Sequence, residues 1–294
     1  MENIPAKTII TKSKAPDYWF GLDYNMNIYK GCSHGCIYCD SRSECYRVKD
    51  FGTVKPKENA LLIIEKELKA KRMKGVVGTG AMTDPYNPLE KKLQLSRDAL
   101  QLIKKYGFGV GITTKSDLVI RDIDVLTEIK KENDVIVNMT VTAADDDLSK
   151  KIEPHVATSG ERFAAIKKLS EAGIFAGILL MPVLPFIEDN KENIGGIIRK
   201  AKEAGAKYIY AAFGVTQRAG QREYFHKKLD ETFPGMKEKY EKTFGDKYNC
   251  ESPHAKELYT FFKEECLKHG LLYKMADIIK AYKKGPRKIQ ESLF

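Results

Sequence analysis

Short apolar runs alternate with amphipathic stretches along most of this chain, and this alternation limits the folds that are open to it. The runs are rich in Val, Ile and aromatic residues, as buried parallel strands are. The stretches between them have the length and the apolar spacing of helices. Strands are expected at residues 25–29, 76–79, 109–113, 135–141, 174–181 and 208–213, and helices at residues 57–73, 94–106, 122–131, 160–172 and 192–204. Repeated strand–helix alternation predicts an α/β protein built on a parallel sheet.

Length and composition are those of a globular protein with a sizeable core. The chain has 294 residues, of which 43% are hydrophobic. This length suits one α/β barrel-type domain or two smaller domains. The longest apolar run, residues 174–187, contains two prolines and is shorter than the ~20 residues of a membrane helix. Because no signal-peptide pattern opens the chain, we expect a cytoplasmic protein that does not enter a membrane.

Three cysteines follow the first expected strand in a short loop with the spacing C-x-x-x-C-x-x-C. They are Cys32, Cys36 and Cys39. Three thiolates this close together can hold one metal centre and leave its fourth position open, which distinguishes a reactive metal site from a structural one. Thiolates are soft ligands that select iron–sulfur clusters, zinc or Cu(I). We therefore expect a metal centre in this segment, the cysteine loop (residues 31–39).

Two other interpretations of the cysteine loop carry less weight. Six cysteines in the whole chain are too sparse for a disulfide framework. A structural zinc site is the stronger rival, because Cys45 or His34 could supply a fourth ligand. Structural zinc sites usually combine two short cysteine pairs, however, and the next cysteine after Cys45 is Cys250. The spacing therefore favours an iron–sulfur centre over zinc.

The cysteine loop has the sequence GCSHGCIYC, which resembles the cluster loop of the radical S-adenosylmethionine (SAM) enzymes. Within that superfamily it is most similar to the spore photoproduct lyase-like branch, which is also described as DNA repair photolyase-like. The resemblance implies that Cys32, Cys36 and Cys39 are the catalytic ligands of a [4Fe-4S] cluster and that SAM chelates the fourth iron. It also implies reductive cleavage of SAM to a 5′-deoxyadenosyl radical, which takes a hydrogen atom from the substrate.

The same resemblance implies a fold and a domain organisation. The family has an open, partial (β/α)6 barrel of the TIM type, which periodicity alone would not single out. We expect residues 21–215 to form this radical SAM core. Residues 1–20 are expected to be an N-terminal extension, and residues 216–294 a helical C-terminal region that packs on the core. In barrel enzymes the chemistry lies at the carboxyl ends of the strands.

Cofactor contacts are predicted mainly at the ends of the expected strands. Residues 78–86 do not match the dinucleotide-binding motif G-x-G-x-x-G, because its sixth position is Thr83. They resemble instead the glycine-rich loop that meets the SAM amino group. Lys115 lies in a Thr-Lys-Ser signature of the branch and can pair with the SAM carboxylate. The cofactor-binding residues expected from the resemblance are Tyr38, Gly78, Gly80, Thr83, Asp84, Lys115, Thr140, Glu153 and Arg162.

Some of these residues have an alternative role. Glu153 and Arg162 match a Glu-Pro…Arg signature of the branch, and an arginine can hold a carboxylate with two hydrogen bonds. They could equally form an ordinary ion pair that fastens a helix to the barrel. Thr140 and Thr142 share one face of the fourth strand. The resemblance favours Thr140 slightly for a contact with the SAM ribose.

One departure from the branch concerns the hydrogen-atom donor. Spore photoproduct lyases have a cysteine in the loop after the second strand, whereas residues 78–86 contain none. Either Cys45, Cys250 or Cys266 takes the place of that cysteine as hydrogen-atom donor, or no cysteine has this role. The substrate therefore stays open between a nucleic acid lesion, a modified RNA base, a peptide and a small metabolite.

The net charge of +10 bears on the partners of the protein. A positive field can attract a nucleic acid, although Lys-rich surfaces also simply keep proteins soluble. A nucleic acid substrate and a reductant of the ferredoxin or flavodoxin type are the expected partners. Two other functions stay open: a non-catalytic zinc protein that docks on nucleic acid, and an iron–sulfur electron carrier. Part of the charge lies in a C-terminal tail that contains Lys280, Lys283, Lys284, Arg287 and Lys288.

Overall fold

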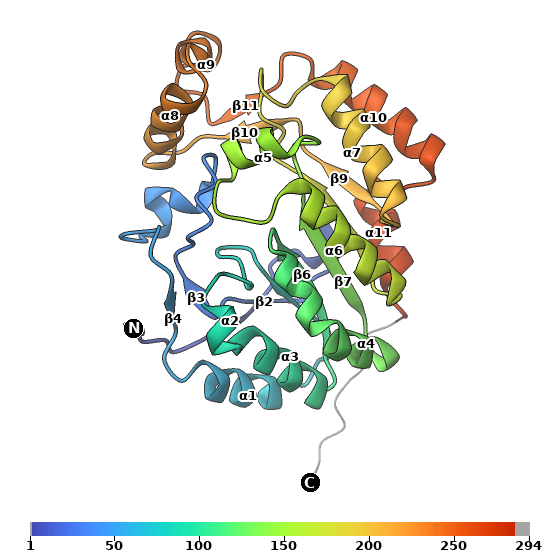
Figure 1. Cartoon of the computed structure of the whole chain (residues 1–294). Helices are drawn as coiled ribbons and strands as arrows, with labels where there is room; N and C mark the ends of the chain where they lie inside the picture. The colour runs from blue at the N-terminus through green and yellow to red at the C-terminus, as the bar shows by residue number, and fades with distance from the viewer. Residues whose placement is uncertain (1, 286–294) are drawn as a thin grey trace.

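The computed structural model describes residues 2–285 and has one central sheet of mostly parallel strands (Figure 1). The sheet has seven strands in the order β1-β2-β5-β6-β7-β8-β9. Every pairing from β2 to β9 is parallel, and β1 alone runs antiparallel to its neighbour. The bounds are Ile10–Lys12 for β1, Tyr24–Met26 for β2, Val76–Thr79 for β5, Gly109–Thr114 for β6, Val135–Thr140 for β7, Phe175–Leu180 for β8 and Ile209–Ala211 for β9.

Helices connect the consecutive parallel strands, which need a crossover, and pack against the sheet through their apolar faces. The main helices are α1 (Ala60–Ala70), α3 (Leu95–Lys105), α4 (Ile123–Glu132), α6 (Ser159–Glu171) and α7 (Lys191–Glu203). Shorter segments are α2 (Glu90–Leu93), α5 (Asp146–Ile152), η1 (Pro16–Tyr18), η2 (Asp40–Arg42), η3 (Glu44–Tyr46) and η4 (Asp117–Asp122). The predicted α/β alternation is confirmed.

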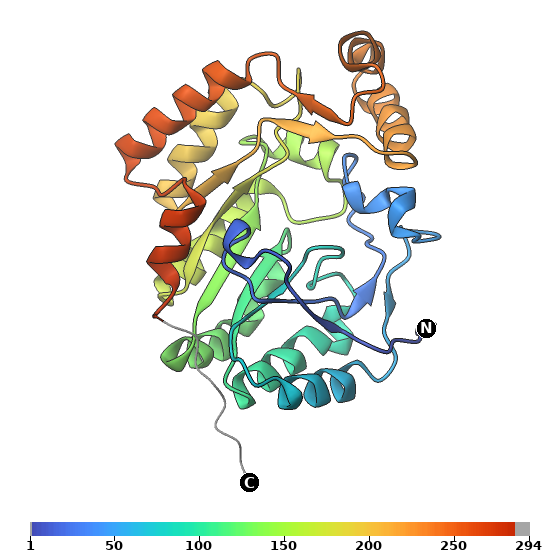
Figure 2. The same cartoon turned by 180° about the vertical axis from the view of Figure 1, so that it is seen from behind.

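The sheet forms an open barrel, because β1 and β9 do not pair with each other in the described part of the chain. Aromatic side chains fill the space at this gap. The rings of Phe20 and Tyr208 lie 5.8 Å apart between centroids. Tyr282, in α11 (Met275–Tyr282), donates a hydrogen bond to the Phe20 carbonyl at 2.5 Å. The N-terminal segment, dark blue in Figure 2, crosses this side of the molecule and contacts α11 through η1.

The chain beyond the barrel forms a C-terminal lobe, residues 214–251, followed by two helices. In the lobe β10 (Gly214–Thr216) pairs antiparallel with β11 (Asn249–Glu251), and α8 (Gln221–Thr232) and α9 (Met236–Phe244) lie between them. After the lobe, α10 (Ala255–His269) packs against α7. The region expected to be helical, residues 216–294, therefore also contains β11 and the last residue of β10. Each strand is only three residues long and is stabilised by pairing across more than 30 positions, which no local periodicity reveals.

Two further differences from the sequence prediction involve the N-terminal part. The first expected strand is split, since β2 ends at Met26 and β3 (Tyr29–Lys30) pairs with β4 (Lys55–Pro56) in a separate sheet. The expected N-terminal extension contributes β1 to the central sheet. The carboxylate of Glu67 in α1 holds β1 by accepting a hydrogen bond from the Ile10 amide at 2.7 Å. No helix within residues 2–285 has the length and apolar character needed to span a membrane.

Candidate active site

Two adjoining cavities open at the carboxyl ends of the parallel strands, the edge that the barrel fold predicts for a site. The large cavity has a volume of about 460 Å³ and the small cavity about 110 Å³. Cys39, Gly80 and Thr113 line both, so the two cavities are neighbours. The wall of the large cavity also includes side chains that sequence reasoning missed, because they come from segments without a motif: Trp19, Leu179, Thr216 and Asn249.

The three cysteines of the cysteine loop face the small cavity. Cys32, Cys36 and Cys39 all line it, and none of them forms a disulfide. Within residues 2–285, no three His, Cys, Asp or Glu side chains are placed so that they could hold one metal ion directly. Three free thiols around one cavity are a donor set that fits an iron–sulfur cluster with one position left for another ligand.

Contacts from distant segments fix the cysteine loop. The Ile37 amide donates a hydrogen bond to the Ile152 carbonyl at 3.0 Å. Gln221 of α8 is fully buried and donates from Nε2 to the Tyr38 carbonyl at 3.1 Å. The C-terminal lobe therefore helps to position the cysteine loop. Sequence reasoning missed Gln221, because a glutamine in an otherwise polar helix carries no signal of burial.

Thr83 and Asp84, predicted as cofactor contacts, bind protein groups. Thr83 donates its hydroxyl to the Gly31 carbonyl. Asp84 accepts hydrogen bonds from the Thr114 hydroxyl at 2.7 Å and from the Lys115 amide at 2.8 Å. Both residues also line the small cavity. They hold the second-strand loop, residues 80–89, against the cysteine loop and the end of β6.

His34 makes the thiol of Cys32 electrostatically different from those of Cys36 and Cys39. Its Nδ1 lies 3.5 Å from Oδ2 of Asp84, and both side chains are buried. Burial alone would raise the pKa of the Cys32 thiol, but the hydrogen bond and charge of His34 hold that pKa below its usual value. Burial alone would likewise lower the pKa of His34, which Asp84 and Cys32 raise. The pKa values of Cys36 and Cys39 are raised, chiefly by burial.

An ionic cluster lies behind the cysteine loop. Glu153 accepts a hydrogen bond from the Tyr38 hydroxyl and pairs with Nη1 of Arg162 at 2.5 Å. Nζ of Lys115 lies 3.9 Å from the same carboxylate. Burial alone would raise the pKa of Glu153, but Arg162 and Lys115 lower it. Because Arg162 and Lys115 share one carboxylate, one positive charge near the thiols is not neutralised. This charge favours the thiolate form of the cysteines, which is the form that binds a metal.

Glu153 and Arg162 lie away from the walls of both cavities. Their side chains are 2% and 0% exposed. Arg162 also donates to the carbonyls of Ala157 at 2.8 Å and Thr140 at 2.9 Å. This arrangement favours the ion pair, the alternative role for these two residues, over direct contact with a cofactor.

Close packing explains the two predicted glycines. Gly80 has a φ of +97°, and a Cβ at this position would lie 1.9 Å from the Thr113 carbonyl oxygen. A Cβ on Gly78 would lie 2.6 Å from the side chain of Leu22. Both glycines line the large cavity. Only glycine lets the chain pass this close to β6 and to the barrel interior.

The other predicted residues are divided between the two cavities. Tyr38 lines the large cavity, and Lys115 and Thr140 line the small one. Thr142 lines neither and follows the end of β7. The structure thus brings every predicted residue except Glu153 and Arg162 to a cavity wall.

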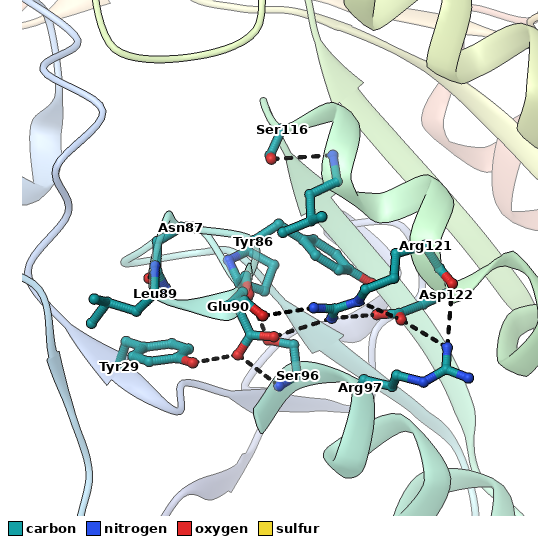
Figure 3. Close-up of polar contacts among 12 residues, drawn as sticks. Tyr29, Tyr86, Asn87, Leu89, Glu90, Ser96, Arg97, Ser116, Arg121 and Asp122 are labelled. Atoms are coloured by element: carbon teal, nitrogen blue, oxygen red, sulfur yellow. Dashed lines mark hydrogen bonds and ion pairs between the residues drawn. The ribbon is translucent and has the colours of Figure 1, made fainter. Parts of the chain in front are cut away.

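A second buried polar network supports the same loops (Figure 3). The carboxylate of Glu90 accepts a hydrogen bond from the Tyr29 hydroxyl and pairs with Nη2 of Arg121 at 3.1 Å. Asp122 in turn joins Arg121 to Arg97, whose Nη1 lies 3.0 Å from Oδ1 of Asp122. Tyr29 precedes the cysteine loop, Glu90 follows the second-strand loop and Arg121 lies in η4 after β6. A charged residue in a helical pattern is normally interpreted as solvent-exposed. The sequence therefore did not reveal that these side chains form a network.

The remaining cysteines differ in exposure. Cys45 is exposed and lies 3.4 Å from Nη1 of Arg218. Nε of Arg218 lies 3.5 Å from Asp40, which lines the large cavity. Cys250 and Cys266 are fully buried in hydrophobic clusters. Of the three candidate hydrogen-atom donors, Cys45 is the exposed one, and its side chain contacts Arg218, which in turn contacts the cavity-lining Asp40.

Sequence comparisons agree with this site. The model of the radical SAM superfamily matches residues 26–201. An uncharacterized protein of Methanocaldococcus jannaschii is 35% identical over 195 residues, which are 65% of this chain and 71% of that protein. An uncharacterized protein of Acidianus two-tailed virus is 26% identical over 218 residues, 69% of this chain and 71% of that protein.

Solved structures share the fold. A spore photoproduct lyase variant with dinucleoside spore photoproduct has a TM-score of 0.67 at 15% identity, over 92% of this chain and 79% of that one. The radical SAM methyltransferase TsrM from Kitasatospora setae has a TM-score of 0.56 at 9% identity, over 88% of this chain and 56% of that one. The superfamily uses a [4Fe-4S] cluster and SAM, which are therefore the cofactors of this chain. By its family match and its three clustered thiols, the chain belongs to the radical SAM superfamily.

Proposed function

We propose that this protein is an enzyme that generates a 5′-deoxyadenosyl radical and uses it to take a hydrogen atom from a substrate in the large cavity. Cys32, Cys36 and Cys39 would hold a [4Fe-4S] cluster, which would supply the electron that cleaves SAM. One observation carries the proposal: three free thiols face a cavity that adjoins a second one of about 460 Å³. That volume lies within the usual range for small-molecule sites.

The residues around the cavities supply position and charge for this chemistry. Lys115 lines the small cavity and can pair with the SAM carboxylate as a point charge. Thr140 offers a hydroxyl beside it, and Gly80 lets backbone groups approach a ligand closely. Tyr38 lines the large cavity, and its hydroxyl donates a hydrogen bond to Glu153. Apolar wall residues such as Leu179 exclude water from a reactive intermediate.

For the substrate we favour a nucleic acid and lyase-like chemistry. Support comes from the shared fold with a spore photoproduct lyase that holds a dinucleoside spore photoproduct, and from the net charge of +10. Lys283, in the described part of the basic tail, does not support this choice of substrate, because it lies away from the cavities. Lys283 lies 3.8 Å from Asp23, just before β2, at the edge of the sheet opposite the cavities. Arg287 and Lys288 lie outside the described residues.

The test is release of 5′-deoxyadenosine from SAM by anaerobically reconstituted, chemically reduced protein. Wild type should release it, and the Cys32→Ala, Cys36→Ala, Cys39→Ala triple variant should not. Cys45→Ala keeps all three cysteines of the cysteine loop and should still cleave SAM, because a hydrogen-atom donor to the substrate acts only after SAM has been cleaved. Bound zinc without iron or acid-labile sulfide would contradict the proposal. A full cluster without SAM cleavage would favour either cleavage that requires bound substrate or an electron carrier.

A second assay addresses the partners. A single-stranded oligonucleotide that carries a thymine photoproduct should raise the rate of SAM cleavage if the substrate is a nucleic acid lesion. A flavodoxin with its reductase should replace the chemical reductant. An unchanged rate with the oligonucleotide would leave the radical chemistry standing and exclude that lesion as the substrate.

A further inference from the structure

Two side chains in the wall of the large cavity carry polar groups that have no partner within the protein. Trp19 is half-buried, Asn249 is exposed, and both line this cavity. In the part of the chain that the structure describes, neither the Trp19 indole N–H nor the Asn249 side-chain amide forms a hydrogen bond. In the small cavity, by contrast, the hydroxyls of Thr83 and Thr114 are bound to protein groups. Unused polar groups in a cavity wall are available to orient a ligand.

Both residues lie outside the part of the chain that the superfamily shares. The family match covers residues 26–201, whereas Trp19 lies in the N-terminal segment and Asn249 in β11. Thr216, which pairs with Asn249 across β10 and β11, lines the cavity too and also lies outside the match. The cluster and SAM are common to the superfamily, so the residues that hold them are expected within the shared part. This stretch of wall is therefore suited to the substrate, which differs between proteins of one fold.

The wall of the large cavity does not suit a phosphate. The described residues that line it include one carboxylate, that of Asp40, and no Lys, Arg or His. Arg218, whose Nε lies 3.5 Å from Asp40, does not line the cavity. The small cavity differs, because Lys115 lines it. A phosphate in the large cavity would face a like charge and no cation, which is unfavourable. The group that enters this cavity should therefore be uncharged.

An indole and a carboxamide together suit an uncharged planar heterocycle. The Trp19 ring is held by edge contacts, with its centroid 5.1 Å from that of Phe20 and 6.1 Å from that of Tyr210, at interplanar angles of 84° and 86°. Among the described rings, none stacks parallel to it. Aromatic side chains bind nucleobases by stacking. A carboxamide places a hydrogen-bond donor beside an acceptor, which matches the edge of a nucleobase.

We propose that Trp19 and Asn249 are specificity-determining residues that bind a single unstacked nucleobase of the substrate, Trp19 by packing against its ring and Asn249 by hydrogen bonds to its edge. The phosphates stay outside the cavity. An enzyme that acts on a base has to take it out of the stack into such a pocket. This inference rests on the proposed function, because it takes the large cavity as the site of a nucleic acid substrate.

The test uses cluster-loaded protein with SAM bound and the cluster kept oxidised, so that SAM is not cleaved. The probe is a fluorescein-labelled deoxypentanucleotide with one base at its centre and abasic residues on both sides, and fluorescence anisotropy gives its affinity. The best of the four bases should bind about tenfold more tightly than the fully abasic pentanucleotide, which has the same phosphates. Equal affinity would overturn the proposal, because the protein would then bind the backbone alone.

Variants assign this difference to the two residues. Trp19→Ala should remove most of it, and Trp19→Phe, which keeps a ring, should retain more of it. Asn249→Ala should weaken binding of the preferred base about fivefold and bring the four bases closer together in affinity. A purely structural role would not change the ranking of the bases. Unchanged affinity and ranking in both Trp19→Ala and Asn249→Ala would overturn the proposal.

Tyr18→Ala and Glu251→Gln are the matched controls. Tyr18 precedes Trp19 and is 82% exposed, and Glu251 is exposed in the same strand as Asn249. Neither residue lines the large cavity. Both controls should bind the probe as wild type does. Losses in the controls as large as those in Trp19→Ala and Asn249→Ala would overturn the proposal, because they would reflect disturbance of the two segments.

SAM itself contains adenine, so its affinity is measured by calorimetry in the same variants. A fall in SAM affinity as large as the fall in oligonucleotide affinity would overturn the proposal, because Trp19 and Asn249 would then bind the adenine of SAM. If Trp19→Ala does not fold, Trp19→Phe and Asn249→Ala must still show their losses. Wild-type protein that forms no cluster would instead refute the proposed function, and iron analysis shows that result before any oligonucleotide is added.

Discussion

The hydroxyl of Tyr38 donates a hydrogen bond to the carboxylate of Glu153, although the two residues are 115 positions apart. Tyr38 belongs to the cysteine loop, and Glu153 directly follows α5. Glu153 also pairs with Arg162 and faces Lys115. One buried carboxylate thus joins the cysteine loop to α6 and to the residue that follows β6.

Replacing Glu153 with Gln should lower the free energy of unfolding by about 3–5 kcal/mol, because it leaves the buried cation of Arg162 without its counter-charge. Urea unfolding measured by circular dichroism checks this value. Glu171→Gln changes an exposed acid in α6, the same helix as Arg162, and should cost less than about 0.5 kcal/mol. Equal unfolding free energies for the two variants would show that the charge of Glu153 is not needed.

Tyr38→Phe should have a much smaller effect on stability. The substitution removes one hydrogen bond and leaves Glu153 paired with Arg162, so we expect a loss of about 1 kcal/mol. Iron content after reconstitution should equal that of wild type, because the three thiols are untouched. Iron analysis beside a urea titration checks both points, and a large loss of iron would mean that the hydroxyl is required to form the site.

Gly80→Ala should damage both the fold and the site. The residue has a φ of +97°, and the new Cβ would lie 1.9 Å from a backbone oxygen of β6. We expect a loss of at least about 2 kcal/mol in stability and at least tenfold weaker SAM binding by calorimetry. Gly52→Ala is the control, since its Cβ would meet no atom within 4 Å. Normal SAM binding in Gly80→Ala would contradict the close approach.

Glu188 should make stability depend on pH. Burial raises the pKa of this carboxyl from 4.5 to about 8, despite hydrogen bonds from the Thr142 hydroxyl and the Leu184 amide. The nearby carboxylates of Glu153 and Asp189 act in the same direction as burial. The folded protein therefore binds this proton more tightly than the unfolded chain does. Its contribution to stability is fully present below pH 4.5 and is lost as the pH rises to about 8.

Glu188→Gln removes this titration. The wild-type protein should lose stability relative to the variant as the pH rises from 4.5 to 8. The difference between the two unfolding free energies should change by at most on the order of 1 kcal/mol per pH unit. Urea unfolding at several pH values gives the difference. A difference that stays constant across this window would show that Glu188 ionises normally in the folded protein.

The sequence by itself determined the alternation of strands and helices and the positions of several site residues. Hydrophobic periodicity is a local property, so it located the parallel strands and the main helices without knowledge of the fold. The spacing of Cys32, Cys36 and Cys39 indicated a metal centre in the same way. The resemblance to the radical SAM loops assigned Lys115, Thr140 and Gly80 to the site, and their places after parallel strands agree with it, because the carboxyl ends of such strands meet at one edge.

Only the tertiary structure decided which polar groups face a cavity and which face one another. Asp84 turned out to support His34, and Glu153 to pair with Arg162 beneath the cysteine loop. Gln221 reaches the loop from the C-terminal lobe. These partners come from segments far apart in the chain. Their contacts depend on strand register and side-chain direction in the folded state, and the local pattern of residues does not encode either one.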